Sequence, residues 1–543
     1  MQSTMMPIPL SLNHLLERAG QLFAGNEIVS RLPDKSLRRH TYGDFHRRAR
    51  SLASALQKLG LQKGDRVATL CWNHHAHLEC YFGIPAAGGV MHTLNLRLAP
   101  DEIGWIAGHA NDRFLVVDDV LLPLYEKFAA LHGFEEVIVV PFSGAKVPAG
   151  FTDYEALLAD ADPEGFEYAP HDENDPVAMC YTSGTTGRPK GVVYSHRSTV
   201  LHTLVASLSD FWGLRGTDCV LPVTPMFHAN SWGMPYGAVM LGVKIVFPGP
   251  HLHPDDLLDL VTEVPPTLAL GVPTIWMTLI QAYEASLADG SPNKGRWKLP
   301  AGMRSLVGGA PVPESLIRAF HKHGVWILQG WGMTETSPVC TISYPRAELE
   351  GADMDERYRR ASLAGVPVPL VDLRVRGDDG EDQPWDGRAV GEIQVRGPFI
   401  TGSYHAVPVE REKFTADGWL RTGDVASVDA LGFVRITDRT KDLIKSGGEW
   451  ISSVDLENAV MAHPAIAEAA VIAIPDEKWG ERPLACVVRK KDQDVTAEQL
   501  NAHLLQRGFA KWQLPDRYEW LDAVPRTSTG KFWKLKLRER FAR

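Results

Sequence analysis

The feature that most constrains this chain is a loop rich in hydroxyl groups and glycines at residues 181–191 (YTSGTTGRPKG). It follows an apolar run, residues 177–180, that is typical of a buried strand. Glycines let the backbone approach an anion closely, successive N–H groups in such a turn bind anions, and Lys190 adds positive charge. A Walker A motif would open a helix with G-K-[ST], but here residues 192–194 (VVY) indicate a second strand. The stretch therefore predicts a phosphate-binding β-hairpin rather than an ordinary flexible turn.

Length and composition indicate a globular chain of several domains. The 543 residues are too many for one core, and 44% hydrophobic with 22% charged residues is ordinary. A formal net charge of −10 without a basic run argues against nucleic-acid binding. The six cysteines form no C-x-x-C pair, which predicts reduced thiols and a cytoplasmic location. There is no secretory signal and no apolar stretch of transmembrane length, while peripheral membrane contact stays open.

Helical and strand patterns alternate over the first part of the chain. Apolar residues at helical spacing run from Phe45 to Leu59 and end at Gly60, and a strand is expected at 66–70. Such alternation predicts an α/β architecture with parallel sheets. Further strands are expected at 114–117, 137–140, 219–222, 244–247, 268–272 and 325–328.

The texture changes in the last third of the chain. Within residues 371–396, runs of alternating apolar and polar side chains are separated by glycine-containing turns. This pattern predicts a small antiparallel β subdomain. Residues from about 442 to 543 have an α+β pattern of their own. It includes a helix at 454–461, for which Ser453 is the expected N-cap.

A second motif, residues 329–338 (QGWGMTETSP), follows the strand expected at 325–328. Trp331 stands between two glycines and offers a flat ring for stacking on adenine. Glu335 suits Mg²⁺, a hard ion that proteins bind with one or two carboxylates together with phosphate oxygens. The alternative interpretation is a helix N-cap at Thr334.

Two turns elsewhere suit a nucleotide. Asp424 ends residues 419–424 (WLRTGD) after a tight glycine turn, where a carboxylate can accept hydrogen bonds from both ribose hydroxyls. Residues 306–311 (LVGGAP) expose the main chain at the glycine pair that includes Gly309, so that a flat ring could lie on it.

Histidines occur in two settings. His228 and Trp232 lie within residues 225–232, just past a strand end, where open α/β sheets bind ligands. A structural role is the alternative for His228. His74, His75 and His77 are interpreted as surface or helix-start histidines rather than a metal site, because only Glu79 is near them at ligand spacing.

Two charged stretches lie near the C-terminus. Residues 438–450 (DRTKDLIKSGGEW) are charged and then glycine-rich, and residues 525–532 (PRTSTGKF) place Lys531 after a small polar loop. A lysine in such a place can extend into a cleft and neutralise charge between a carboxylate and a phosphate. A solvated turn and an exposed basic loop are the alternatives.

Taken in order, these stretches resemble the signature motifs of the adenylate-forming superfamily, which includes acyl-CoA synthetases, luciferases and peptide-synthetase adenylation domains. The whole chain is most similar to the branch of medium- and long-chain fatty acid–CoA ligases. The resemblance implies a large N-terminal α/β domain of parallel-sheet layers with a small β subdomain (1–437), a hinge (438–443) and a small mobile α+β domain (444–543). Many relatives carry Tyr at the position of Trp331 and Gly at that of Asp438.

The resemblance also implies roles for particular residues. The implied catalytic residues are Lys531, Thr334, Glu335 and His228, the implied Mg²⁺ ligands are Thr182 and Glu335, and the implied hinge residue is Lys441. The implied acyl-site residues are Trp232, Gly309 and Pro338. The implied nucleotide and CoA contacts are Thr182, Ser183, Gly184, Thr185, Thr186, Gly187, Lys190, His228, Ala229, Gly309, Gln329, Gly330, Trp331, Thr334, Asp424, Arg439, Lys441, Lys445 and Trp450.

The implied reaction has two halves and uses ATP, CoA and Mg²⁺. A carboxylic acid first attacks the α-phosphate of ATP, and a thiol then attacks the acyl-adenylate after the small domain rotates. The favoured substrate is a medium- or long-chain fatty acid, with short (including sulfur-bearing propionate) or aryl acids as alternatives. A non-catalytic nucleotide or acyl sensor is disfavoured because Lys531, Glu335 and Asp424 are all present. A peptide-synthetase module is disfavoured because no carrier segment follows Arg543, and the resemblance implies a homodimer.

Overall fold

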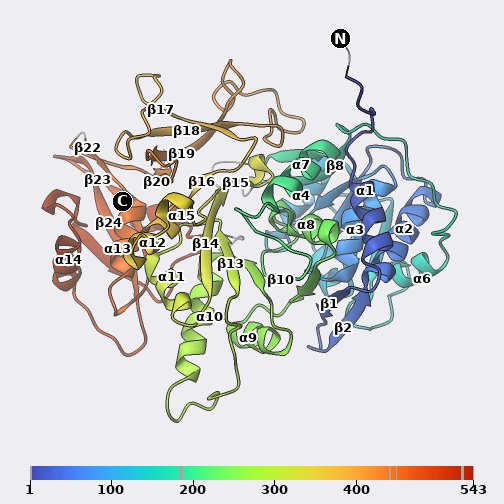
Figure 1. The fold of residues 1–543 in the computed structure, drawn as a ribbon, viewed down its shortest axis with the longest axis horizontal. Helices are drawn as coiled ribbons and strands as arrows, with labels where there is room; N and C mark the ends of the chain where they lie inside the picture. Colours follow the sequence, from blue (N-terminus) through green and yellow to red (C-terminus); the bar gives the residue numbers. More distant parts are fainter. Residues whose placement is uncertain (1–2, 183–187, 440–441, 448, 528–530, 542–543) are drawn as a thin grey trace.

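The structure is a computed structural model, and it describes all residues except 1–2, 183–187, 440–441, 448, 528–530 and 542–543. Its described residues form four β-sheets. Figure 1 shows a blue to cyan α/β layer, a green to yellow layer beside it, an orange sheet above and a red C-terminal part. Within the described chain, no helix has both the length and the apolar character needed to cross a bilayer.

The first sheet, blue to cyan in Figure 1, has the strand order β7-β6-β5-β3-β4-β8-β9. Its strands are parallel except β9, which pairs antiparallel with β8 and thereby forms the hairpin expected around residues 181–191. The strands are β3 (Arg66–Leu70), β4 (Val90–Thr93), β5 (Asp112–Asp118), β6 (Glu136–Val140), β7 (Thr152–Asp153), β8 (Pro176–Tyr181) and β9 (Gly191–Ser195). The helices of this part are α1 (Leu12–Leu22), α2 (Tyr42–Lys58), α3 (His75–Ala86), α4 (Pro100–Ala110), α5 (Leu122–Tyr125), α6 (Tyr154–Ala159) and α7 (His196–Ala206).

The second sheet has the order β16-β15-β14-β13-β12-β10-β11-β1-β2, with a parallel centre and antiparallel edges. The parallel strands end at one edge of the sheet, the edge at which open α/β sheets bind ligands. The strands are β1 (Glu27–Arg31), β2 (Leu37–Thr41), β10 (Cys219–Pro222), β11 (Lys244–Phe247), β12 (Leu268–Gly271), β13 (Arg304–Gly308), β14 (Trp326–Gly332), β15 (Val339–Ile342) and β16 (Val366–Pro367). The helices are α8 (Met234–Leu241), α9 (Pro254–Glu263), α10 (Pro273–Ser286), α11 (Glu314–His321) and α12 (Met354–Ala361).

Two smaller sheets complete the fold. The orange antiparallel sheet is the expected β subdomain, with strands β17 (Asp372–Arg376), β18 (Gly391–Arg396), β19 (Leu420–Val428) and β20 (Val434–Arg439). The red C-terminal part contains β21 (Ile444–Ser446), β22 (Glu449–Ile451), β23 (Ile466–Asp476), β24 (Gly480–Arg489), β25 (Arg517–Trp520), α13 (Ser453–Met461), α14 (Ala497–Gln506) and α15 (Lys534–Phe541).

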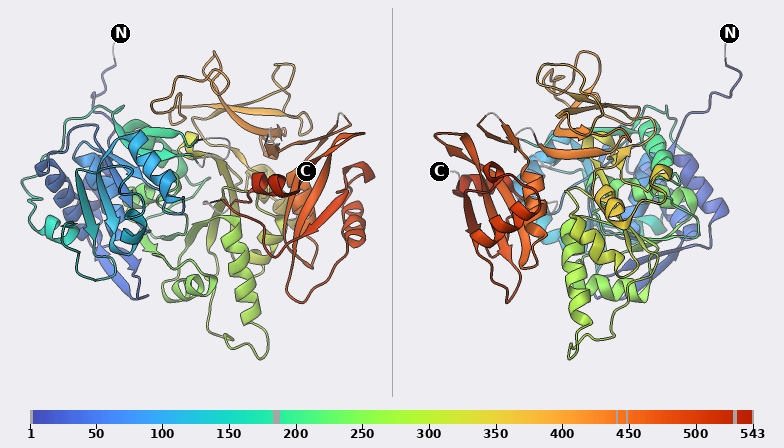
Figure 2. Two further views of the ribbon diagram at one scale, coloured as in Figure 1. Left: turned by 180° about the vertical axis from the view of Figure 1, so that it is seen from behind. Right: turned by 60° about the vertical axis from the view of Figure 1, so that its left-hand side comes forward.

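The hydrophobic cores separate the C-terminal part from the rest. One cluster joins buried residues of the first three sheets, from Leu12 to Val434. The clusters of the C-terminal part take their buried members from Ile444 to Leu537. A core of its own is typical of a domain, and Figure 2 shows the red part standing to one side of the other layers. The fold is therefore mixed α/β with a separate C-terminal domain, as the sequence predicted.

One local expectation was wrong. Ser452, not Ser453, is the N-cap of α13, and its side chain accepts a hydrogen bond from the N–H of Asp455. The hydroxyl of Ser453 instead donates to Asp438 at 2.5 Å. Adjacent serines are equivalent caps in a sequence, so the choice between them depends on a tertiary neighbour.

Candidate active site

A cavity of about 290 Å³ lies where the β8–β9 hairpin meets the ends of β13 and β14. The predicted site residues that line it are Thr182, Lys190, His228, Ala229, Trp232, Gly309, Gly330, Trp331, Thr334, Glu335, Pro338, Arg439 and Lys531. A neighbouring cavity of about 480 Å³ is also lined by Gly309, Gly330, Trp331, Arg439 and Lys531, together with Gln329 and Asp424. Residues 183–187 and Lys441 lie outside the described residues. Segments far apart in the sequence therefore meet at one place.

The hairpin is closed by hydrogen bonds on both sides of its loop. The N–H of Thr182 donates to the carbonyl of Lys190 at 2.9 Å, and the N–H of Lys190 donates to Thr182 Oγ1 at 3.0 Å. The ammonium of Lys190 lies 2.6 Å from both carboxylate oxygens of Glu410 and 5.0 Å from the ring centre of Tyr404. An ammonium held by a carboxylate at a cavity is also suited to a phosphate, since both anions accept charge-assisted hydrogen bonds.

Glu335 is oriented by Tyr404, a residue that sequence reasoning missed. The phenol of Tyr404 donates to Glu335 Oε1 at 2.7 Å. Burial, reinforced by the Glu335 carboxylate, raises the pKa of Tyr404, so the phenol keeps its proton and remains a donor. Tyr404 lies outside the named helices and strands, where no periodicity in the sequence marks it. The adjacent carbonyl of Thr334 accepts a hydrogen bond from the Tyr194 hydroxyl at 2.8 Å.

Trp331, Asp424 and Arg439 form a connected group between the two cavities. The indole N–H of Trp331 donates to Asp424 Oδ2 at 3.0 Å, and Arg439 Nε lies 3.1 Å from Asp424 Oδ1. The charge of Asp424 raises the pKa of Arg439. Gln329, by contrast, uses its side-chain oxygen to accept a hydrogen bond from the N–H of Val312 at 2.9 Å, which holds the loop after β13.

His228 precedes a turn with unusual backbone geometry. Burial, together with the positive charges of Lys531 and Arg97, lowers the pKa of His228 to about 3, so its imidazole is neutral. The next four residues, 229–232, have φ values of 43°, 52°, 50° and 59°. Residues with a Cβ atom rarely adopt this left-handed region, and such strain concentrates at functional sites. The sequence contains no glycine in this run, so nothing in it indicated the turn.

Trp232 ends that turn and lies against a glycine surface. A Cβ atom at Gly308 would lie 2.6 Å from the carbonyl oxygen of Gly330 and 3.5 Å from the indole of Trp232. At Gly309 a Cβ atom would lie 3.9 Å from the same indole. The close approach to the carbonyl of Gly330 therefore requires glycine at position 308, and Trp232 lies beside both glycines at the side of the cavity that Leu306 and Val339 also line.

Lys531 comes from the C-terminal domain but lines both cavities. Its N–H donates to Thr527 Oγ1 at 3.2 Å, and the N–H of Thr527 donates to the carbonyl of Lys531 at 2.8 Å. Lys531 Cε would lie 3.8 Å from a Cβ atom at Gly309. The lysine is thus adjacent to the loop that follows β13.

Lys445 and Trp450 are not brought to either cavity. They pair across the β21–β22 hairpin, where the ammonium of Lys445 lies 5.0 Å from the Trp450 ring centre. Trp450 is 42% exposed. In this orientation of the C-terminal domain, neither residue lines the two cavities that Lys531 lines.

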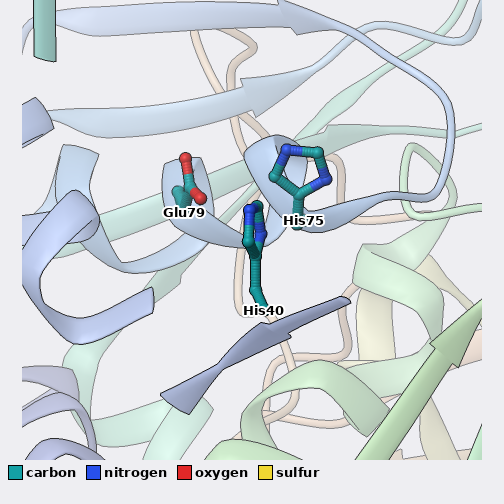
Figure 3. Close-up of side chains that lie close together, drawn as sticks. All are labelled: His40, His75 and Glu79. Carbon is teal, nitrogen blue, oxygen red and sulfur yellow. The ribbon is translucent and has the colours of Figure 1, made fainter. Parts of the chain in front are cut away.

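The histidines near the start of α3 are buried, so the expectation of surface histidines was wrong, although His74 does cap this helix. Figure 3 shows His40, His75 and Glu79, whose potential ligand atoms lie within 4.8 Å of one another. Arg48 already binds Glu79 at 2.7 and 3.2 Å, and Arg38 Nε donates to His40 Nε2 at 3.1 Å. Two guanidinium groups thus occupy the atoms that a cation would need, which disfavours a metal here.

Comparison with known proteins identifies relatives that match nearly the whole chain. The family model described as AMP-binding enzyme matches residues 16–405, and the model of its C-terminal domain matches residues 455–531. A long-chain-fatty-acid–CoA ligase of Thermus thermophilus is 48% identical over 99% of this chain and 97% of its own length. A 3-methylmercaptopropionyl-CoA ligase of Ruegeria lacuscaerulensis is 42% identical over 100% and 99%. The crystal structure of the anthranilate CoA ligase AuaEII with anthranoyl-AMP has a TM-score of 0.85 at 25% identity, covering 99% of both chains. The chain therefore belongs to the AMP-binding enzyme family of adenylate-forming CoA ligases.

Proposed function

We propose that this enzyme is a medium- or long-chain fatty acid–CoA ligase that works through an acyl-adenylate. ATP and CoA are the co-substrates that follow from its family. The observation that carries the proposal is the position of Lys531, which comes from the C-terminal domain yet lines the same cavity as Glu335 and Lys190. A cation supplied by one domain to the phosphate-binding surface of another suits a reaction between two anions.

In the first half-reaction, the substrate carboxylate attacks the α-phosphate of ATP, a new P–O bond forms and pyrophosphate leaves. Lys190 binds phosphate in place of Glu410, and Asp424 accepts hydrogen bonds from the ribose. Lys531 stabilises the charge shared by the carboxylate and the α-phosphate. His228, neutral because burial lowers its pKa to about 3, contributes hydrogen bonds rather than charge. Such positioning and electrostatic stabilisation are typical of phosphoryl chemistry.

The residues present fit a magnesium ion. Thr182 and Glu335 both line the smaller cavity, and both offer the oxygen atoms that Mg²⁺ prefers. Tyr404 binds one oxygen of Glu335, and a carboxylate has a second. When bound, Mg²⁺ would neutralise phosphate charge.

In the second half-reaction, the thiol of CoA attacks the acyl carbonyl and AMP leaves. Lys531 fills the space beside Gly309. We therefore propose that the C-terminal domain rotates about a hinge at residues 438–443 and opens this space to the thiol of CoA. That rotation would also carry Lys445 and Trp450 to a new position. Domain rotation between steps is a known form of gating.

The acyl class is proposed from the apolar side of the cavity, where Trp232, Leu306 and Val339 lie. We propose that Trp232 moves to admit the acyl chain. The relatives act on acids of different lengths: the Thermus enzyme is named for long-chain fatty acids and the Ruegeria enzyme for 3-methylmercaptopropionate. A short sulfur-bearing acid is therefore the second candidate. A homodimer and a cytoplasmic location stay predictions.

The test is release of pyrophosphate, and then of AMP when CoA is added, with straight-chain acids from propionate to stearate. The panel also includes 3-methylmercaptopropionate, cinnamate and benzoate. We expect the highest kcat/KM with a medium- or long-chain acid. A maximum of kcat/KM at 3-methylmercaptopropionate or at an aryl acid would replace fatty acids as the proposed substrate class. The absence of pyrophosphate release with every acid would favour a nucleotide or acyl sensor.

A further inference from the structure

Charged side chains without an assigned role are buried where β20 meets the C-terminal domain. Asp438 of β20 is 2% exposed, and Glu457 of α13 is 6% exposed. Lys534, the first residue of α15, keeps 12% of its side chain exposed. Burying an unpaired charge costs free energy. The role of this cluster therefore depends on the groups that pair with its three charged residues.

The carboxylate of Asp438 is bound at the N-terminus of α13. Its Oδ2 accepts hydrogen bonds from the N–H of Ser453 at 3.0 Å and from the Ser453 hydroxyl at 2.5 Å. The first N–H groups of a helix lack partners within the helix and carry partial positive charge, so a carboxylate is stabilised there. The Ser452 hydroxyl also donates to the carbonyl of Thr437 at 2.6 Å. Two successive residues of β20 thus hold the first turn of α13.

Lys534 extends this contact to the segment of the proposed catalytic lysine. Its ammonium lies 2.7 Å from Glu457 Oε1 and donates to the Ser453 hydroxyl at 2.6 Å. Burial alone would lower the pKa of Lys534, but the carboxylates of Glu457, Asp438 and Asp442 raise it, so the ammonium stays charged. Because α15 begins at Lys534, shortly after Lys531, the position of Asp438 is coupled to that of Lys531.

Asp438 begins the proposed hinge and precedes residues 440–441, whereas Ser453, which it binds, and Lys534, which binds Ser453, follow the hinge. We propose that Asp438 is a latch, a positioning residue that holds α13 and α15 in the orientation that brings Lys531 to the cavity and releases them for the CoA step. This inference rests on the proposed function, because it requires the domain rotation. The ion pair between Arg482 and Asp516, at 2.7 Å, lies wholly within the C-terminal domain and is the internal reference.

The latch makes a quantitative prediction about the two half-reactions. A contact that exists in one of two orientations shifts their equilibrium by its own free energy. Adenylation requires the observed orientation and thioester formation requires the other, so the ratio of the two rates follows the equilibrium between them. Weakening the latch must therefore raise the rate of thioester formation relative to the rate of adenylation, whichever orientation predominates.

The first experiment measures both half-reactions in Asp438→Asn. Adenylation is followed by pyrophosphate release in single turnover, and thioester formation by AMP release from supplied acyl-adenylate and CoA. We expect the ratio of thioester to adenylation rate to rise about tenfold, the effect of losing one charge-assisted hydrogen bond. Asp516→Asn, which removes a carboxylate charge from the pair with Arg482 inside the C-terminal domain, is the matched control and should change both rates by one common factor. An unchanged ratio in a folded Asp438→Asn protein would overturn the latch.

The second experiment needs no activity. All six native cysteines are buried, so a water-soluble thiol reagent can report on a cysteine placed by Lys531→Cys. Adding Asp438→Asn should speed its labelling, because residue 531 would leave the cavity more often, and adding Asp516→Asn should not. Equal labelling rates in all three proteins would overturn the latch. This conclusion would hold even if the enzyme releases pyrophosphate with a carboxylic acid, as the proposed function requires. Faster labelling, combined with no pyrophosphate release from any acid by the protein that retains Lys531, would support the latch and reject the ligase function.

Discussion

The indole N–H of Trp331 donates a hydrogen bond to Oδ2 of Asp424 at 3.0 Å. Arg439 lies 3.1 Å from the other carboxylate oxygen, so both oxygens proposed to receive the ribose hydroxyls are already oriented. A site whose ligand-binding groups are held in place loses less entropy when the ligand binds. The aromatic residue at position 331 would then have two functions, since its ring faces the base and its N–H fixes the carboxylate.

Trp331→Phe keeps an aromatic ring and removes the N–H. We expect the KM for ATP to rise by up to about tenfold, the effect of losing one hydrogen bond to a charged group, with kcat nearly unchanged. Steady-state kinetics at saturating acid measure this. Trp326→Phe is the matched control, because it lies on the same strand and its buried indole N–H has no hydrogen-bond partner. Equal KM values in the two variants would show that the Trp331 N–H does not orient Asp424.

Lys531→Ala tests the charge delivered to the cavity. Loss of one preorganised donor should slow pyrophosphate release by roughly 10²–10³-fold, while thioester formation from supplied acyl-adenylate should persist. Lys536→Ala, an exposed position on α15, serves as the control for changes in helix stability. If both half-reactions slow equally in Lys531→Ala, the lysine does not serve the first step alone.

Elements that depend on local pattern were predictable, and contacts across the chain were not. The strand at 66–70 and the hairpin around residues 181–191 follow from apolar runs and glycines close together in the sequence. The pairing of Lys190 with Glu410 joins residues 220 positions apart, and no periodicity connects them. The left-handed turn at 229–232 was hidden for another reason: its side chains give no sign of positive φ, and only the surrounding packing makes the strain tolerable.

Gly308→Ala tests the close approach of β13 and β14 beneath Trp232. The added methyl group would lie 2.6 Å from the carbonyl oxygen of Gly330, so one strand must shift. We expect the free energy of unfolding to fall by about 1–3 kcal/mol, as for other overpacked sites, and the KM for the acid to rise. Gly133→Ala is the control, because a Cβ atom there has no neighbour within 4 Å. Chemical denaturation that finds the two variants equally stable would contradict the packing argument.

Buried histidines predict loss of stability in acid. Burial lowers the pKa of His202 to about 3, and it accepts a hydrogen bond from the N–H of Val339 at 3.2 Å. Below about pH 6.5 the unfolded chain binds a proton at this residue and the native state does not, so stability falls as the pH falls. His40, His77, His196 and His228 have pKa values lowered in the same direction.

We therefore expect the free energy of unfolding to decrease steadily between pH 6.5 and 4. In His202→Gln, whose amide oxygen can replace the acceptor, the slope should be smaller by about 1.4 kcal/mol per pH unit. Urea titrations at several pH values measure the slope, and the same replacement at exposed His14 accounts for the substitution itself. A slope that His202→Gln leaves unchanged would mean that this imidazole is protonated in the native state.

The pair formed by Lys534 and Glu457 gives the sharpest stability prediction. Lys534→Met leaves the Glu457 carboxylate buried without its ammonium partner, so the free energy of unfolding should fall by about 3–5 kcal/mol. Combining it with Glu457→Gln removes both charges and should recover most of this loss, because well-packed uncharged groups often replace a buried ion pair without penalty. A double-mutant cycle by chemical denaturation measures the coupling. If the two losses simply added, the ion pair would contribute nothing specific, and Lys534 would have to be held by its apolar stem alone.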